Sequence, residues 1–381
     1  MKNSPVIKGK VDPKFKNVQN VFRKHFEKNK ETFAQLCIYI QGRKVVDLWG
    51  SKNTSNQYNG DSITNVFSCT KNLTSLAVAM LVDRGHLKYE DKISQHWQEF
   101  GQNGKEDITL ADLMRHEAGL TMFDHEFDPE DFWPANIKRN NVGIVIEKKK
   151  PYWPKTGKRE YHGLTRGWIA NEVFRRVHPD GLTIGEFLTD EVAKPLQCNG
   201  IVLGAQNEDL KRYQPLHHID YDGVNGRRKA MINCSGGENG EIWNNIEMRK
   251  GETPSANGNC SARGLAKVGA ILAGKGSLGN VNLLSESGWK ALHDDITEET
   301  MLGKQTFFSQ GGIAKLDFGY FGWVGYGGSC FQWNPELQIS FAYVPSLLIP
   351  STNLADDGER GESLKIALIE SLKKPFENRG L

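Results

Sequence analysis

The sequence predicts an α+β fold in which an antiparallel sheet is assembled from both ends of the chain and a mainly helical region is inserted between them. Two hairpin patterns carry this prediction. Apolar residues alternate along 36–40, and a turn at 41–43 leads into a second strand-like run at 44–49. A similar hairpin is expected over 328–344, with its turn at 334–336. Most periodic segments between the hairpins are helical, so distant parts of the chain must supply the strands of one sheet.

Helical patterns at both ends of the sequence complete this architecture. The segments 14–28 and 362–374 are expected to be helices that cover the sheet. Within the insertion, Thr109 and Thr183 are each followed three residues later by an acidic side chain, which is typical of a capped helix start. The stretch 223–259 has weak periodicity and is expected to be a long loop or a boundary.

Composition excludes several classes of function. The 381 residues include 48 basic and 46 acidic side chains, giving a formal net charge of +2 with no large basic region. The run 148–150 is interpreted as a solvated loop, so no nucleic-acid partner is expected. No apolar stretch approaches the roughly 20 residues that span a bilayer, and none follows Met1 as a signal region would. We therefore expect no membrane span and a cytoplasmic location.

The cysteines favour neither a disulfide framework nor a metal site. They are widely scattered, with no Cys-x-x-Cys spacing and no paired Cys/His cluster, so we expect reduced thiols. No cofactor and no metal are expected. The six are Cys37, Cys69, Cys198, Cys234, Cys260 and Cys330.

The strongest chemical signal is Ser68-Cys69-Thr70-Lys71, which lies between the β-prone 65–67 and a helical pattern at 72–81. If the helix begins near Ser68, residues three apart share a face, and the Lys71 amine lies one turn along from the Ser68 hydroxyl. Free backbone N–H groups and the helix dipole at such a junction favour negative charge. The string itself is not specific, because Ser287-x-x-Lys290 and Ser371-x-x-Lys374 also match it. A solvated helix start is the alternative interpretation.

Two further motifs follow in order. Tyr161-His162-Gly163 stands in the inserted region, and Tyr326-Gly327-Gly328-Ser329 directly precedes the C-terminal hairpin. Framing segments at 47–50, 110–120 and 254–258 occur in a matching order. With these motifs, residues 10–370 resemble the serine β-lactamase-related superfamily, which includes class C β-lactamases, penicillin-binding proteins and β-lactamase-like esterases. The chain is most similar to β-lactamase-domain serine hydrolases of bacteria and animals.

This resemblance implies a β-lactamase/transpeptidase-like fold with the active site between two domains. Residues 1–66 and 255–381 would form the sheet domain, and 67–254 the mainly helical domain with long loops. Ser68 would be the nucleophile, forming an acyl-enzyme that water releases. Lys71 and Tyr161 are both candidates for the resting base, and the choice between them stays open because their titrations are coupled.

The resemblance also implies how the substrate is held. The backbone N–H groups of Ser68 and Ser329 would form the oxyanion hole. Tyr326, Gly327 and Gly328 would bind substrate along the strand edge, and His162 would give a supporting contact there. In the superfamily an Asn commonly occupies the place of Gly163 and a Lys that of Tyr326, and both differences argue against efficient hydrolysis of β-lactam antibiotics.

We therefore expect a serine hydrolase that acts on an ester, amide or peptide. Its partner would be a small molecule or peptide with a scissile carbonyl, and a homo-oligomer stays open. The alternative is a catalytically silent scaffold or binding protein that self-assembles, since a fold alone does not settle function. Labelling by a fluorophosphonate distinguishes the two, because only an activated serine reacts.

Overall fold

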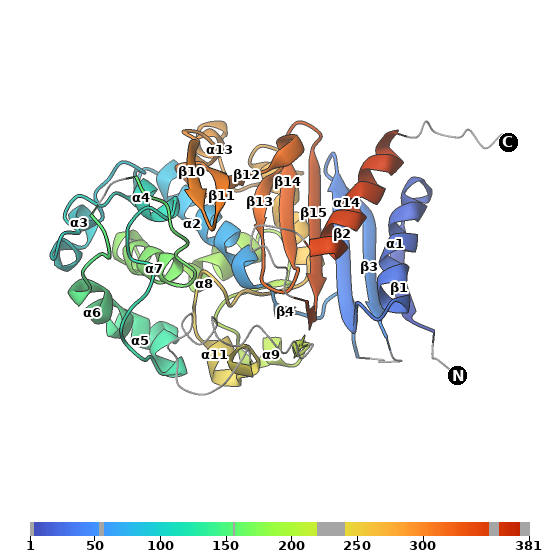
Figure 1. Cartoon of the computed structure of the whole chain (residues 1–381), viewed down its shortest axis with the longest axis horizontal. Coiled ribbons are helices and arrows are strands. Elements are labelled where there is room, and N and C mark those ends of the chain that lie inside the picture. Colours follow the sequence, from blue (N-terminus) through green and yellow to red (C-terminus); the bar gives the residue numbers. More distant parts are fainter. Residues whose placement is uncertain (1–3, 53–56, 155–156, 219–240, 350–357, 374–381) are drawn as a thin grey trace.

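The computed structural model describes residues 4–52, 57–154, 157–218, 241–349 and 358–373. Its centre is an antiparallel sheet to which both halves of the chain contribute (Figure 1). In spatial order the strands are β1 (Val6–Val11), β3 (Arg43–Ser51), β2 (Phe33–Ile40), β15 (Ile339–Pro345), β14 (Cys330–Asn334), β13 (Phe321–Val324), β12 (Ala314–Lys315), β11 (Lys304–Phe308) and β10 (Thr297–Met301).

The two predicted hairpins form the middle of this sheet, and they meet through β2 and β15. Ile38 pairs with Phe341, so strands from opposite ends of the chain are direct neighbours. The hairpin β10–β11 lies outside the two predicted ones. Its first strand carries two consecutive glutamates, Glu298 and Glu299, and is mostly exposed, so no apolar alternation marks it in the sequence.

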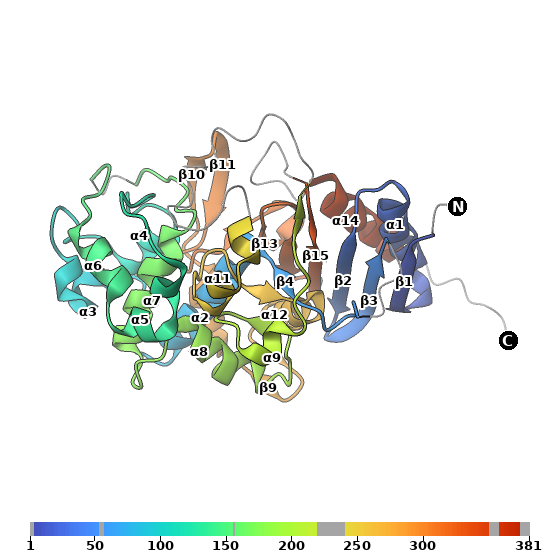
Figure 2. The ribbon, with the colours of Figure 1, turned by 90° about the horizontal axis from the view of Figure 1, so that it is seen from below.

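Helices cover both faces of the sheet, and the two predicted terminal helices lie together on one of them. Figure 2 shows α12 (Ala262–Ala273) on one side, with α1 (Lys16–Glu27) and α14 (Gly358–Lys373) on the other. Strand β15 is buried along its whole length because its side chains alternate between these two faces. Phe341 belongs to the apolar core beneath α1 and α14, whereas Val344 belongs to the core that contains α12.

The inserted region is mainly helical and, in Figure 1, extends to the side of the molecule opposite the two chain termini. Its helices are α2 (Thr70–Asp83), α3 (Ile93–His96), α4 (Leu110–Met114), α5 (Pro134–Lys138), α6 (Asn141–Lys148), α7 (Thr165–Val177), α8 (Ile184–Phe187), α9 (Asn207–Leu210) and α11 (Ile246–Lys250). Thr109 and Thr183 cap α4 and α8, accepting hydrogen bonds from Asp112 and Glu186, so both predicted helix starts are confirmed.

Further short elements complete the described structure. They are α13 (Glu286–His293), the small sheet of β4 (Thr64–Asn65), β7 (Asn259–Cys260) and β5 (Ile201–Val202), the pair β6 (His217–His218) with β16 (Leu347–Leu348), and the pair β8 (Ser277–Leu278) with β9 (Val281–Asn282).

Helix α2 links the helical region to the sheet. It is buried from Thr70 to Leu81, so its start is not the solvated one that the alternative interpretation required. At the sheet, the Asn72 side chain donates to the carbonyl of Phe331 in β14, at 3.2 Å. The N-terminus of α2 is therefore held against the middle of the sheet. No helix in the described ranges is both long and apolar enough to span a bilayer.

Candidate active site

Ser68 lies in a single 3₁₀ turn (Phe67–Cys69) between β4 and α2, as the sequence predicts. Phe67, directly before it, adopts a left-handed φ of 46°. The side chain of Asn65 holds this conformation by accepting the N–H of Phe67 at 2.6 Å. A left-handed bulky residue stores roughly 1–3 kcal/mol of backbone strain, and such strain concentrates at functional sites.

Lys71, one turn along, is 2% exposed and points its amine at three oxygens. Nζ lies 3.3 Å from Ser68 Oγ, and it donates to the carbonyls of Gly163 at 2.7 Å and Ser255 at 3.0 Å. The carbonyls can only accept, whereas the hydroxyl can also donate. A neutral amine has two N–H bonds and one lone pair, which matches two carbonyls and one hydroxyl.

Tyr161 approaches Ser68 from the segment before α7. Its hydroxyl donates to Ser68 Oγ at 2.6 Å and accepts from the indole N–H of Trp323 at 3.3 Å. Its ring also faces Lys71 Nζ, 4.8 Å from the ring centroid. The three side chains that the sequence singled out therefore meet, and Ser68 lies between the other two.

Burial shifts the pKa values of Lys71 and Tyr161, the two titratable neighbours of Ser68, in opposite directions. It lowers the pKa of Lys71 well below the usual lysine value, and the Arg166 guanidinium lowers this pKa further. Burial raises the pKa of Tyr161, although hydrogen bonds with Ser68 and Trp323 oppose the shift. Both directions favour a neutral lysine beside a neutral tyrosine.

The third motif forms the turn between β13 and β14, beside the nucleophile segment. Ser329 Oγ donates to the carbonyl of Val66 at 2.9 Å, which places this residue next to the turn that carries Ser68. The ring of Tyr326 meets the ring of Phe67 edge-on, with centroids 5.4 Å apart. The first and last residues of the motif thus both contact the segment that precedes the nucleophile.

The two glycines of this motif have φ values that other residues rarely adopt. Gly327 has φ +81° and Gly328 has φ +107°. A Cβ on Gly327 would lie 2.4 Å from the side chain of Leu348. The carbonyl of Gly327 accepts a hydrogen bond from the buried guanidinium of Arg360 in α14. The C-terminal helix therefore holds the turn in place through this hydrogen bond.

His162 is fully buried, and backbone groups occupy both of its ring nitrogens. Nε2 accepts the N–H of Leu120 at 3.0 Å, and Nδ1 lies 2.6 Å from the carbonyl of Glu160. Burial lowers the pKa of His162 to about 4. A substrate contact by this side chain would require these bonds to break, so the geometry favours the supporting role for His162.

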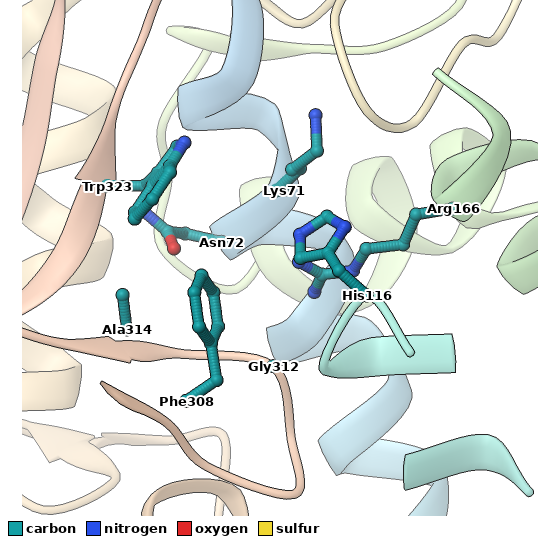
Figure 3. Close-up of a pocket in the computed structure, with 8 residues that line it drawn as sticks. All are labelled: Lys71, Asn72, His116, Arg166, Phe308, Gly312, Ala314 and Trp323. Atoms are coloured by element: carbon teal, nitrogen blue, oxygen red, sulfur yellow. The ribbon is translucent and has the colours of Figure 1, made fainter. Parts of the chain in front are cut away.

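Three side chains at the site carry no motif signal in the sequence. Trp323 stacks on Tyr161, with ring centroids 6.1 Å apart, and is marked only by preceding Tyr326 by three positions. Arg166 and Arg360 are buried cations, but an isolated arginine in a sequence is read as a surface charge. In Figure 3, Trp323, Lys71 and Arg166 line one small cavity with His116.

No group of three or more potential metal ligands occurs among the described residues. Cys37, Cys69, Cys198, Cys260 and Cys330 are free thiols, and Cys234 lies outside the described residues. Four of these five thiols are buried, and Cys69 directly follows Ser68. Burial raises the pKa of the Cys69 thiol to about 12, so this neighbour stays protonated at neutral pH.

Comparisons with known proteins find relatives that match nearly the whole chain. The chain is 27% identical over 383 residues to the esterase/beta-lactamase LipL of Mycobacterium tuberculosis, covering 91% of this chain and 85% of LipL. It is 28% identical to a crystal structure of a penicillin-binding protein homologue from Caulobacter crescentus, with a TM-score of 0.80 over 96% of this chain and 100% of that one.

A family VIII carboxylesterase of known structure is 26% identical, with a TM-score of 0.84 over 96% of this chain and 100% of the other. The shared fold is the antiparallel sheet with flanking helices described above. The family match itself runs from residue 18 to residue 363, which includes all three motifs. This protein therefore belongs to the beta-lactamase family.

Proposed function

We propose that this protein is a serine hydrolase that cleaves an ester, amide or peptide substrate through an acyl-enzyme on Ser68. The observation that carries the proposal is the position of Ser68 Oγ, 3.3 Å from Lys71 Nζ and 2.6 Å from the Tyr161 hydroxyl. A serine hydroxyl is a weak nucleophile until a neighbouring group takes its proton. Both neighbours are within reach of that proton.

Lys71 is the better candidate for the resting base. Its lowered pKa favours the neutral amine, whose lone pair faces Ser68 when both N–H bonds point at carbonyls. Tyr161 with a raised pKa stays protonated at neutral pH and donates to Ser68 Oγ. This assignment gives each group one role, with Lys71 taking the first proton and Tyr161 serving as the acid.

The reaction then proceeds in two balanced stages. Ser68 Oγ bonds to the substrate carbonyl carbon while its proton moves to Lys71. The N–H groups of Ser68 and Ser329 stabilise the resulting oxyanion. The bond to the leaving group breaks as Tyr161 protonates that group, and Lys71 returns its proton to Tyr161. Water then attacks the acyl carbon and gives up a proton to the same pair. The ester bond to Ser68 breaks as the pair passes that proton to Ser68 Oγ, which releases a carboxylic acid and restores the starting enzyme.

The surroundings of Ser68 favour an ester with a neutral acyl group. The third motif presents the ring of Tyr326 rather than a cation, and Phe67 packs edge-on against both Tyr326 and Trp243, with centroids 5.4 and 5.8 Å apart. An aromatic wall stabilises apolar groups and offers no charge to a substrate carboxylate. LipL is named an esterase/beta-lactamase and the other relative a carboxylesterase, and both names support an ester as substrate.

Mass-spectrometric labelling with a fluorophosphonate tests the proposal. We expect one adduct on Ser68 that disappears in Ser68→Ala and falls strongly in Lys71→Met. Ser287→Ala is the matched control, because Ser287 starts another Ser-x-x-Lys string but is exposed on α13, and it should label as the wild type does. Absence of an adduct in folded wild-type protein would refute the proposal and favour the silent scaffold.

Substrate choice is tested on the same preparation. We expect turnover of a nitrophenyl butyrate and little turnover of a chromogenic cephalosporin, with both activities absent in Ser68→Ala. Efficient hydrolysis of the cephalosporin without ester hydrolysis would contradict the proposal that the rings of Phe67, Tyr326 and Trp243 select an ester with a neutral acyl group.

A further inference from the structure

Arg166 is a buried cation without a buried anion. It is 1% exposed and lies in the first turn of α7. No carboxylate forms an ion pair with it anywhere in the part of the chain that the structure describes. By contrast, buried Arg159 pairs with Glu117 at 2.7 Å and buried Arg360 with Glu31 at 2.8 Å. An unpaired buried charge is strongly unfavourable, so its retention needs a reason.

The hydrogen bonds of Arg166 are too few to supply that reason. Nη2 donates to Ser75 Oγ on α2 at 2.5 Å, Nη1 lies 3.4 Å from Nε2 of His116, and Nε has no partner. Gly312 leaves room for the guanidinium, since a Cβ there would lie 2.6 Å from Nη2. The site accommodates the group sterically but leaves much of its hydrogen-bonding capacity unused.

Helix stability does not account for Arg166 either. The N-terminus of a helix carries a partial positive charge, so a cation in its first turn is unfavourable. An uncharged side chain of similar length would serve α7 better. The position of Arg166 therefore suggests a role outside its own helix.

That role involves Lys71. Figure 3 shows the Arg166 side chain passing behind His116 toward α2, on which Lys71 stands. Both side chains line the same narrow cavity, whose interior has no room for a water molecule that would screen their charges. The titratable groups that face the pair from the surrounding elements are Cys69, Tyr89, His116, Tyr161 and His162, all neutral at neutral pH.

We propose that Arg166 is a positioning residue whose buried charge holds Lys71 in the neutral form that accepts the proton of Ser68. The proposal rests on the proposed function above and explains why no anion accompanies Arg166. A carboxylate in this cavity would cancel the effect by stabilising a second cation. Burial of Lys71 is the larger cause of its lowered pKa, and Arg166 is the second.

Selective ¹³C labelling of lysine, with Lys71→Met to assign the signal, allows the pKa of Lys71 to be read directly by NMR. We expect Arg166→Gln to raise this pKa by about one unit or more. Ser75→Ala is the matched control, because it removes the hydrogen bond of Arg166 and leaves the charge. A pKa of Lys71 that is equal in wild type and Arg166→Gln, both folded by near-UV circular dichroism, would overturn the inference.

Fluorophosphonate labelling across pH 6–9 gives the matching functional readout, because Arg166, whose pKa burial lowers to about 10, stays charged over this range. In Arg166→Gln the midpoint of the pH profile should rise with the pKa, with about tenfold slower labelling on the acid limb for each unit, and the rate should recover at high pH. A purely structural role would lower the rate at every pH and leave the midpoint in place, which would also overturn the inference. Failure of the proposed function is distinguishable, because it removes labelling in the wild type while the NMR titration still reports on Arg166.

Discussion

Replacing Arg360 by Met should destabilise the protein and slow its chemistry together, because one guanidinium connects the C-terminal helix to the third motif. Arg360 donates to the carboxylate of Glu31 at 2.8 Å, to the carbonyls of Lys30 at 3.1 Å and Leu347 at 3.0 Å, and to the carbonyl of Gly327. The Glu31 side chain is fully buried, and its second oxygen has no hydrogen-bond partner. Met fills similar space but supplies no donor.

The loss in the free energy of unfolding depends on Glu31, which keeps its buried position without a partner. Removing one partner of a buried ion pair costs about 3–5 kcal/mol, because the other group is left as a buried charge or must take up a proton. Burial raises the pKa of Glu31 to about 8, so unfolding is measured at pH 9, where this carboxyl is ionised in the wild type. With a urea m-value of about 3 kcal/mol per molar, the unfolding midpoint of Arg360→Met should fall by about 1 M or more. Adding Glu31→Gln should recover at least about 1 kcal/mol of this loss, because the group left behind is then neutral.

Urea unfolding followed by tryptophan fluorescence measures these changes. Glu359→Gln is the matched control, because Glu359 stands on the same helix in an exposed pair with Lys30 and should contribute no more than about 1 kcal/mol. In folded Arg360→Met we also expect Ser68 to label about tenfold more slowly or worse, since a single oxyanion donor is worth more than that. A loss below 1 kcal/mol, or no recovery by Glu31→Gln, would refute the reasoning.

Three further outcomes are expected. Tyr161→Phe should slow labelling of Ser68 by about 10²–10⁴-fold without unfolding the protein, and an unchanged rate would rule out Tyr161 as the acid. The lowered pKa of Lys71 means that the unfolded chain binds a proton there that the folded chain does not, so the free energy of unfolding rises with pH between the folded and unfolded pKa values. Lys71→Met should reduce this slope by up to about 1.4 kcal/mol per pH unit, measured by urea unfolding at several pH values. Equal slopes in wild type and variant would contradict the lowered pKa. Phe22→Ala should lower the free energy of unfolding by about 3–5 kcal/mol, because Phe22 is fully buried. Phe318→Ala should lower it by less than about 0.5 kcal/mol, because that side chain is 87% exposed. Similar losses in the two variants would contradict the burial of Phe22 in the core.

The central part of the fold could be predicted because its strands alternate strongly. The segments around Ile38 and Phe341 combine apolar alternation with clear turns, so both hairpins follow from local pattern. The strand at 297–301 could not be predicted in this way. Its glutamates favour no strand, and it is ordered by pairing with 304–308.

The candidate site also contains residues that the sequence could predict and residues that it could not. Ser68, Lys71 and Tyr161 belong to motifs, and the family resemblance that these motifs carry implied that the three side chains meet. Arg166 and Arg360 could not be found because nothing in a sequence says that a given arginine is buried. Their positions depend on side chains from elements far apart in the sequence, which only the folded structure brings together.

The pairing of β2 with β15 also has a consequence for synthesis. Strand β2 leaves the ribosome early, yet its partner at 339–345 follows about 300 residues later. At roughly 5–20 residues per second, the apolar edge of β2 stays unpaired for roughly 15–60 s. During that interval the edge is a template for pairing with other chains, so efficient production should depend on chaperones that cover it. Ser329 arrives in the same late segment, so a nascent or truncated chain already carries Ser68 but lacks the strand edge beside it, and hydrolysis should begin only once the last strands are in place.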